Sequence, residues 1–206
     1  MTETLGLFPL GTVLVPGERL PLHIFEPRYR ELIGECLERS QPFGFIRSHG
    51  DQIGPVGTRA AVTEVLTRHP DGTFDIVVAG GRRFHLVELT AGRSFITGRV
   101  EDFEDLPDPA TPDEAARCRQ AFDRLLVQIG ADPAASPLPS DDEALAFAIA
   151  AVVELPPALK QELLASRSER DRVRLLTEAL TGPVTEDLRG REIARRAAAN
   201  GHVTKD

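Results

Sequence analysis

Short apolar runs separated by turn residues fill the first half of the chain, which is the pattern of a β-rich fold. Thr58–Thr67 and Phe74–Ala79 flank a His-Pro-Asp-Gly turn signal, so we expect them to form a hairpin. Prolines interrupt the earliest runs, and because proline cannot donate a hydrogen bond to a sheet, those strands are expected at edges or bulges. Further strands are predicted at Leu5–Leu10, Val13–Val15, Leu20–Ile24, Phe43–Arg47, Arg83–Leu89 and Phe95–Phe103.

One helix is predicted among these strands. Pro27 occupies a first-turn position, where proline is favoured. The apolar residues that follow recur at i, i+3, i+4, i+7 and i+8, which places them on one helix face: Tyr29, Leu32, Ile33, Cys36 and Leu37. A series of short strands with one helix and frequent turns indicates a small twisted barrel or pseudo-barrel.

The second half of the chain changes to a helical period after a proline-rich linker, Leu106–Pro112. A short helix is expected after Pro156 and Pro157. Three further helix starts in the second half carry the spacing of a capping box: Thr111–Glu114, Ser140–Glu143 and Ser166–Glu169. The fold class is therefore predicted as α+β, with a β subdomain over residues 1–106 and a four-helix bundle over residues 107–206.

Composition and charge narrow the classes of protein. The 206 residues are 41% hydrophobic and 27% charged, the balance of a folded soluble domain. Acidic residues outnumber basic ones by 32 to 24, and the net charge of −8 argues against a nucleic-acid partner, which requires a basic surface. The longest small and apolar run, Ala144–Val153, is about half the length of a membrane span. Without a signal sequence or a disulfide spacing, we expect a cytoplasmic protein.

Motifs that would carry catalysis or cofactor binding are missing from the sequence. Neither lysine follows a glycine, so there is no P-loop, and no G-x-G-x-x-G is present. The five histidines show no metal-ligand spacing with one another, with cysteine or with carboxylates. His23 and His85 are interpreted as structural histidines on strands, and Cys36 as a core thiol. We therefore predict no catalytic residue, no cofactor and no metal, and a protein that is not an enzyme.

Two charged clusters each have a functional and a simpler interpretation. Gly80–Arg83 is similar to a backbone nest for an anion, but a hairpin turn with exposed arginines explains it with fewer assumptions. Glu101–Asp105 is similar to an acidic site, but a solvated strand end that runs into the linker is the favoured interpretation. Neither cluster is therefore predicted to be a site.

The N-terminal string is more specific than any of these motifs. Leu7–Leu10, Val13–Gly17 and Leu20–Tyr29 resemble the N-terminal, substrate-binding domain of Lon proteases. The resemblance spans about residues 5–182. It continues through Val56–Thr58, Asp71–Val78 and Gly80–Phe84, and in the second half through Leu155–Gln161 and Ser168–Leu176.

This resemblance implies a PUA-like pseudo-barrel with one helix, followed by a helical bundle. It also implies binding of exposed polypeptide. A full Lon protease adds an ATPase module and a serine–lysine peptidase module, and neither has a matching segment in this sequence. We therefore expect a non-catalytic, stand-alone Lon-domain protein whose partners are unfolded or specific polypeptide segments.

The expected polypeptide contacts are polar side chains on the outward face of the first helix. They are Arg28, Arg30 and Glu31. The proline-punctuated strands between Leu7 and Ile24 are candidate edges on which a peptide could pair as an added strand.

Two other classes of function stay open. PUA-like folds include RNA binders, although the negative charge, one Tyr and no Trp argue against base stacking. A small-molecule pocket or an unrecognised hydrolase site, in a cleft between barrel and bundle, would be supported by His23 or His85 beside a carboxylate and a hydroxyl. A two-fold homodimer is the commonest form of self-association, but nothing in the sequence requires it.

Overall fold

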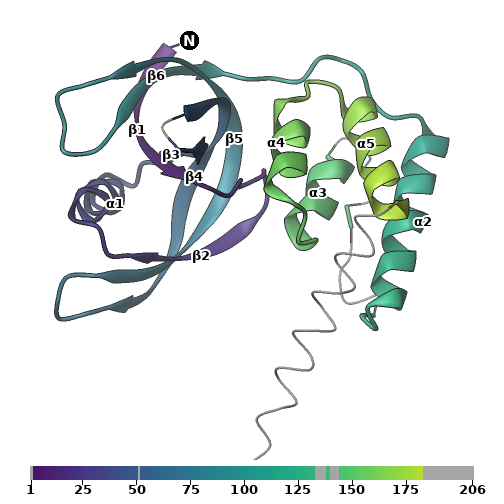
Figure 1. Cartoon of the computed structure of the whole chain (residues 1–206), viewed down its shortest axis with the longest axis horizontal. Helices are drawn as coiled ribbons and strands as arrows, with labels where there is room; N and C mark the ends of the chain where they lie inside the picture. Colours follow the sequence, from purple (N-terminus) through teal and green to yellow (C-terminus); the bar gives the residue numbers. More distant parts are fainter. Residues whose placement is uncertain (1, 51, 133–137, 140–143, 183–206) are drawn as a thin grey trace, which may run out of the picture. The chain divides into compact units, whose positions relative to one another are not determined.

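The computed structural model describes residues 2–50, 52–132, 138–139 and 144–182. In this part of the chain it contains six strands and five helices, which confirms the α+β class (Figure 1). The chain divides into two compact units, Met1–Leu106 with Pro156–Arg167, and Pro107–Leu155 with Ser168–Asp206. None of the described helices is long and apolar enough to cross a membrane.

The first unit is built on one sheet that closes into a barrel. The strands are ordered β2-β5-β4-β3-β1-β6, and a further pairing of β5 with β6 closes the ring. Closure is possible because β5 is long: Phe74–Ala79 pairs with β2, and Phe84–Thr90 pairs with β6. The strand bounds are β1 Thr2–Leu10, β2 Arg19–Ile24, β3 Phe43–His49, β4 Gln52–Arg68, β5 Phe74–Thr90 and β6 Thr97–Asp102.

The segment Gly80–Gly81 lies inside β5 and not at a turn, so the two strands predicted on either side form one. A Cβ on Gly80 would lie 2.2 Å from the carbonyl oxygen of Val15. Glycine at this position therefore lets Val13–Val15 lie directly against β5, where Gly80 N donates to Glu18 O at 2.9 Å. Val13–Val15 is buried but is not a strand, in contrast to the prediction.

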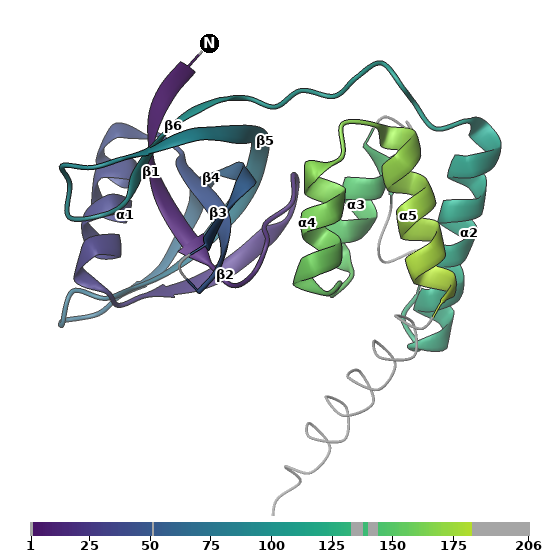
Figure 2. The ribbon, with the colours of Figure 1, turned by 45° about the horizontal axis from the view of Figure 1, so that its top comes forward.

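Helix α1 (Pro27–Arg39) forms as its periodicity predicts and covers one side of the barrel (Figure 2). The centroids of the Phe8 and Tyr29 rings lie 4.3 Å apart. In Figure 1, α1 lies between the β4–β5 hairpin tip and the β5–β6 connection, and side chains of α1 bond to both. Four residues of its buried face pack into the barrel core: Tyr29, Leu32, Ile33 and Cys36.

Helix α4 (Pro157–Ala165) belongs to the first unit. Its Lys160 is buried and forms an ion pair with Glu18, with 2.5 Å between Nζ and Oε1. The buried guanidinium of Arg83, on β5, donates to the carbonyl oxygen of Leu164 near the end of α4, at 2.7 Å. One cation from the helix and one from the sheet therefore fix α4 to the barrel.

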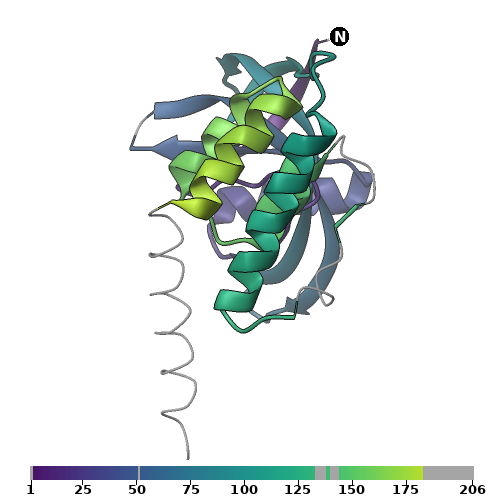
Figure 3. The same cartoon turned by 90° about the vertical axis from the view of Figure 1, so that its right-hand side faces the viewer.

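The described part of the second unit holds α2 (Pro112–Gln128), α3 (Leu145–Val152) and α5 (Glu169–Thr181). Helices α2 and α5 run side by side (Figure 3). A bundle of four helices is not confirmed, because α4 groups with the barrel. Inside this unit the guanidinium of Arg172 is fully buried, where its Nε donates to Glu169 Oε2 at 2.8 Å.

The capping predictions have different outcomes. The box at Thr111 is confirmed: Thr111 N donates to Glu114 Oε2 at 2.8 Å, and Glu114 N donates to Thr111 Oγ1 at 3.3 Å. The box predicted from Ser166 is wrong, because Ser166 ends α4 and the N-cap of α5 is Ser168, whose hydroxyl accepts from Asp171 N at 3.0 Å. The segment 140–143 lies outside the described residues.

Candidate functional site

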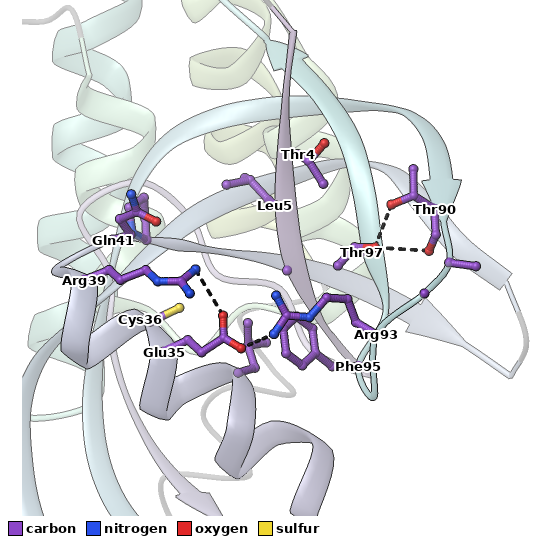
Figure 4. A pocket seen from close by; sticks show the side chains of 15 residues that line it. Thr4, Leu5, Glu35, Cys36, Arg39, Gln41, Thr90, Arg93, Phe95 and Thr97 are labelled. Carbon is purple, nitrogen blue, oxygen red and sulfur yellow. Dashed lines mark hydrogen bonds and ion pairs between the residues drawn. The ribbon is translucent and has the colours of Figure 1, made fainter.

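A pocket of about 430 Å³ opens on the first unit, between the start of β1, helix α1 and the β5–β6 connection (Figure 4). Because Gln41 and Pro42 line it and immediately precede β3, the pocket lies where β3 would continue beside β1. The α1 residues recur at i, i+3, i+4 and i+7, which is one face of the helix. The lining residues are Thr4–Gly6, Leu32, Glu35, Cys36, Arg39, Gln41, Pro42, Thr90–Arg93, Phe95 and Thr97.

Strand β1 presents an unpaired edge at this pocket. β6 pairs with β1 over Thr2–Gly6, whereas β3 pairs with it only over Leu7–Leu10. Leu7 N donates to Ile96 O at 2.8 Å, so by the alternation of a strand the N–H and C=O of Thr4 point away from β6. Among the described strands, none pairs with β1 on that side over Thr2–Gly6. The Thr4 backbone is therefore available to an additional strand.

One carboxylate and two guanidinium groups line the pocket. Glu35 pairs with Arg93 of the β5–β6 connection and with Arg39, whose Nη1 lies 3.2 Å from Glu35 Oε2. The guanidinium of Arg93 also covers the Phe95 ring, with 4.6 Å between Cζ and the ring centroid. These three charges sum to +1, so the pocket favours carbonyl oxygens or carboxylates of a ligand.

Cys36 lines the pocket but is not poised for nucleophilic chemistry. Burial, and secondarily the Glu35 carboxylate, raises the pKa of its thiol to about 11. A protonated thiol is a poor nucleophile near neutral pH. None of the lining residues is a histidine. The pocket therefore offers groups for binding, and its thiol behaves as a core residue.

The three residues predicted to contact polypeptide all have partners within the chain. Arg30 Nη1 donates to Asp71 O, at the tip of the β4–β5 hairpin, at 2.8 Å. Glu31 Oε2 accepts from Ser94 Oγ at 2.6 Å. Arg28 forms an ion pair with Glu26, the residue before α1, with 2.8 Å between Arg28 Nη2 and Glu26 Oε2. None of the three lines the pocket, although Ser94 lies within the connection that does.

Buried arginines change the interpretation of both charged clusters. The prediction of exposed arginines is wrong for Arg83, which is buried and pairs with Asp105. Arg59 is also buried, and its Nη2 lies 2.8 Å from Asp102 Oδ1. The solvated strand end predicted at Glu101–Asp105 thus contains two carboxylates that neutralise buried guanidinium groups. These contacts tie the end of β6 and the residues after it to the barrel strands β4 and β5, and sequence spacing gives no sign of them.

The fold also brings together residues without metal-ligand spacing in the sequence. His23 Nδ1 lies 2.7 Å from Asp75 Oδ1, and His69 Nε2 lies 2.6 Å from Asp75 Oδ2. A second histidine–carboxylate pair is looser, with 3.7 Å between His85 Nδ1 and Glu101 Oε1. The group around Asp75 therefore has the composition of a metal site, which spacing along the chain does not indicate.

Two solved structures share this fold. One is a Lon N-terminal domain protein from Xanthomonas campestris, with a TM-score of 0.67 and 24% sequence identity, covering 84% of this chain and 96% of that chain. The other is the N-terminal domain of a Mycobacterium avium complex Lon protease, with a TM-score of 0.68 and 20% identity, covering 88% and 100%. At these identities the likeness establishes an architecture of the Lon N-terminal type.

The family model of the ATP-dependent protease La (LON) substrate-binding domain matches residues 4–182, and the chain therefore belongs to this family. The Lon protease of Paraburkholderia phytofirmans is 28% identical over 200 residues, which are 88% of this chain and 24% of that protein. The Lon protease of Methylocella silvestris is 26% identical over 206 residues, 92% and 25% respectively. The chain thus spans about a quarter of the length of these relatives, and the resemblance in the N-terminal motifs is confirmed.

Proposed function

We propose that this chain binds extended polypeptide segments at the pocket lined by β1, α1 and the β5–β6 connection, and that it does so without catalysing a reaction on them. The observation that carries the proposal is the unpaired edge of β1 at Thr4, which faces the pocket. A peptide that pairs there adds a strand to the sheet through main-chain hydrogen bonds. The class of ligand is supported by the family, whose model describes a substrate-binding domain.

Side chains around the edge would decide which segments bind best. Arg39 and Arg93 flank the single carboxylate of Glu35, so an acidic side chain or a carbonyl-rich turn beside the paired backbone finds donors there. The net charge of the whole chain, −8, opposes a polyanion such as nucleic acid. A polypeptide is therefore the proposed partner, with unfolded chains bound through their backbone and specific segments favoured by their charge.

A titration with a fluorescent, permanently unfolded polypeptide tests this site. We expect saturable binding by the wild-type chain in the absence of nucleotide. Thr4→Pro should weaken it at least ~10-fold, because proline removes the N–H that points to the pocket and none that bonds to β6. A peptide methylated on alternate backbone nitrogens should bind the wild-type chain with a similar loss.

A matched pair of arginine variants controls for general charge effects. Arg93→Gln removes a pocket guanidinium and should weaken binding, whereas Arg19→Gln removes an exposed guanidinium of β2 outside the pocket and should not. Circular dichroism checks that each variant is folded. If Thr4→Pro and the methylated peptide bind as tightly as their parents, the strand-edge site is wrong. If the wild-type chain shows no saturable binding, recognition of unfolded polypeptide is wrong as well.

The role of Arg28, Arg30 and Glu31 as polypeptide contacts remains a prediction. Glu31 is the best placed of them, because Arg93 Nη2 lies 3.6 Å from Glu31 Oε1 while also lining the pocket. A ligand that takes the Arg93 guanidinium would therefore release Glu31. Glu31→Gln in the same titration separates two roles: binding of an acidic segment should weaken if Glu31 contacts the polypeptide, and should strengthen if Glu31 only competes for the Arg93 guanidinium.

A further inference from the structure

Two histidines and one aspartate converge at one end of the barrel, on the other side of α1 from the pocket's β5–β6 connection. His23 belongs to β2 and Asp75 to β5, and the two residues are direct cross-strand partners. His69 follows β4 and begins the hairpin that leads into β5. One ligand atom from each residue lies within 4.8 Å of the other two.

The backbone around these residues is tied down, so the three side chains start from fixed positions. His69 N donates to Thr73 O at 3.0 Å and closes the hairpin. Asp71 Oδ1 accepts from Thr73 N at 3.0 Å, and Arg30 of α1 holds the carbonyl oxygen of Asp71. Directly after β2, the exposed Phe25 ring stacks on the His23 ring, with 6.0 Å between centroids.

We propose that His23, His69 and Asp75 form a binding site for a divalent transition-metal ion of the zinc class, with water or a ligand group in the remaining position. Two imidazole nitrogens and a carboxylate oxygen are a donor set that zinc takes in three-ligand sites with an open fourth position. Zinc–ligand distances of about 2.0–2.1 Å place tetrahedral donors roughly 3.3 Å apart. The two histidine–carboxylate separations, 2.6 and 2.7 Å, each need to open by a fraction of an ångström, and the two imidazole nitrogens, which lie within 4.8 Å of each other, need to come to about the same 3.3 Å spacing.

The Asp75 carboxylate is the group that links the two histidines. Asp75 contacts each histidine through a different oxygen, so it lies between the two rings and a rotation of its carboxylate can direct one oxygen to a shared ion. The side chains of His23, His69 and Asp75 are 53%, 36% and 35% exposed, which leaves solvent access for the ion and for its fourth ligand. A bound ion would join β2 to the β4–β5 hairpin tip.

Cobalt(II) is the probe we would use first, because its visible absorption reports ligand number and type directly, with zinc(II) added afterwards as a competitor. The chain is used without a polyhistidine tag. We expect one cobalt ion per chain with the intense visible bands of a low-coordinate nitrogen–oxygen site, and loss of these bands when zinc is added. His23→Gln and Asp75→Asn should each weaken cobalt binding at least ~10-fold.

His85→Gln is the matched control, because His85 faces a single carboxylate at 3.7 Å and should leave cobalt affinity unchanged. As a second readout, zinc should raise the melting temperature of the wild-type chain and of His85→Gln, but not of His23→Gln. The proposal is overturned if the wild-type chain does not bind cobalt or zinc. It is overturned equally if Asp75→Asn binds as tightly as the wild type, or if His85→Gln loses as much affinity as His23→Gln.

Discussion

Lys160 and Glu18 place two opposite charges inside the first unit, where their side chains are 9% and 10% exposed. Loss of the cation would leave the Glu18 charge buried, because its second oxygen accepts from Val15 N at 3.0 Å and is held in place. A buried charge that loses its partner is costly. We expect Lys160→Met to lower the free energy of unfolding by about 3–5 kcal/mol, measured by urea denaturation.

A double variant separates the charge from the packing. Glu18→Gln combined with Lys160→Met removes both charges and should recover a large part of the stability. The neighbouring Arg19→Gln breaks an exposed ion pair with Glu64 and should cost less than about 1 kcal/mol. Equal instability of the single and double variants would show that lost packing, and not the unpaired charge, is responsible.

Sequence carries a signal for the buried lysine but none for its partner. Lys160, Leu163 and Leu164 follow the i, i+3, i+4 spacing of a buried helix face, so a lysine in this lysine-poor chain stands on an apolar stripe. Glu18 is 142 residues away and lies in a loop whose position depends on the barrel. The contacts among His23, His69 and Asp75 are likewise set by strand register, which spacing along the chain does not reveal.

At the scale of elements, the start of α2 is a capping box reinforced by charge. Hydrogen bonds from the Thr111 backbone and hydroxyl, and then the Arg174 guanidinium, lower the pKa of the Glu114 carboxyl to about 2. Because this pKa is below that of the unfolded chain, about 4.3, the carboxylate stabilises the fold above that value, and the contribution is lost as the pH falls toward 2. We expect Glu114→Gln to melt below the wild type at pH 7, with a gap that narrows from about pH 5 downward.

Thermal melts at a series of pH values would measure that gap. Asp113 is a useful control, because it occupies the same first turn and Asp113→Asn also removes one negative charge near the helix N-terminus. A gap for Glu114→Gln that stays constant between pH 7 and pH 2 would contradict the lowered pKa. The same outcome would assign the capping box a purely geometric role.

Elements governed by local chemistry are the ones that the sequence predicts well. Helix α1 and the Thr111 capping box depend on neighbours within one or two turns, and both are confirmed. The start of α5 also depends on a distant partner, because the hydroxyl of its N-cap, Ser168, donates to Asp108 Oδ2 at 2.6 Å. Gly80–Gly81 has the composition of a turn, yet both glycines lie within the continuous strand β5. Gly80 is needed there because the Val15 backbone comes too close for a side chain. The assignment of α4 to the barrel follows from buried cations and not from helical periodicity.

At the scale of the whole molecule, the order of the chain and the grouping of its elements differ. The chain forms the barrel, continues into α2 and α3, returns to the first unit with α4 and ends its described part with α5 in the second. A change of period at Leu106–Pro112 marks the first of these transitions. The return of α4 has no such signal, since α3, α4 and α5 are all helical. The pocket likewise cannot be read from local sequence, because β1, α1 and the β5–β6 connection, which line it, are far apart along the chain.

Cys36 and Cys118 are buried free thiols in different units, so they report on each unit separately. Burial raises the pKa of both thiols, so each is expected to react slowly with a labelling reagent at pH 8 and faster when its unit opens locally. Gly80→Ala forces a Cβ against Val15 O inside the first unit, so it should speed labelling of Cys36 and not of Cys118. Mass spectrometry measures the rate of labelling at each cysteine. Gly34→Ala on α1, where a Cβ meets nothing within 4 Å, should speed neither. Equal acceleration at both cysteines would mean that the units open together.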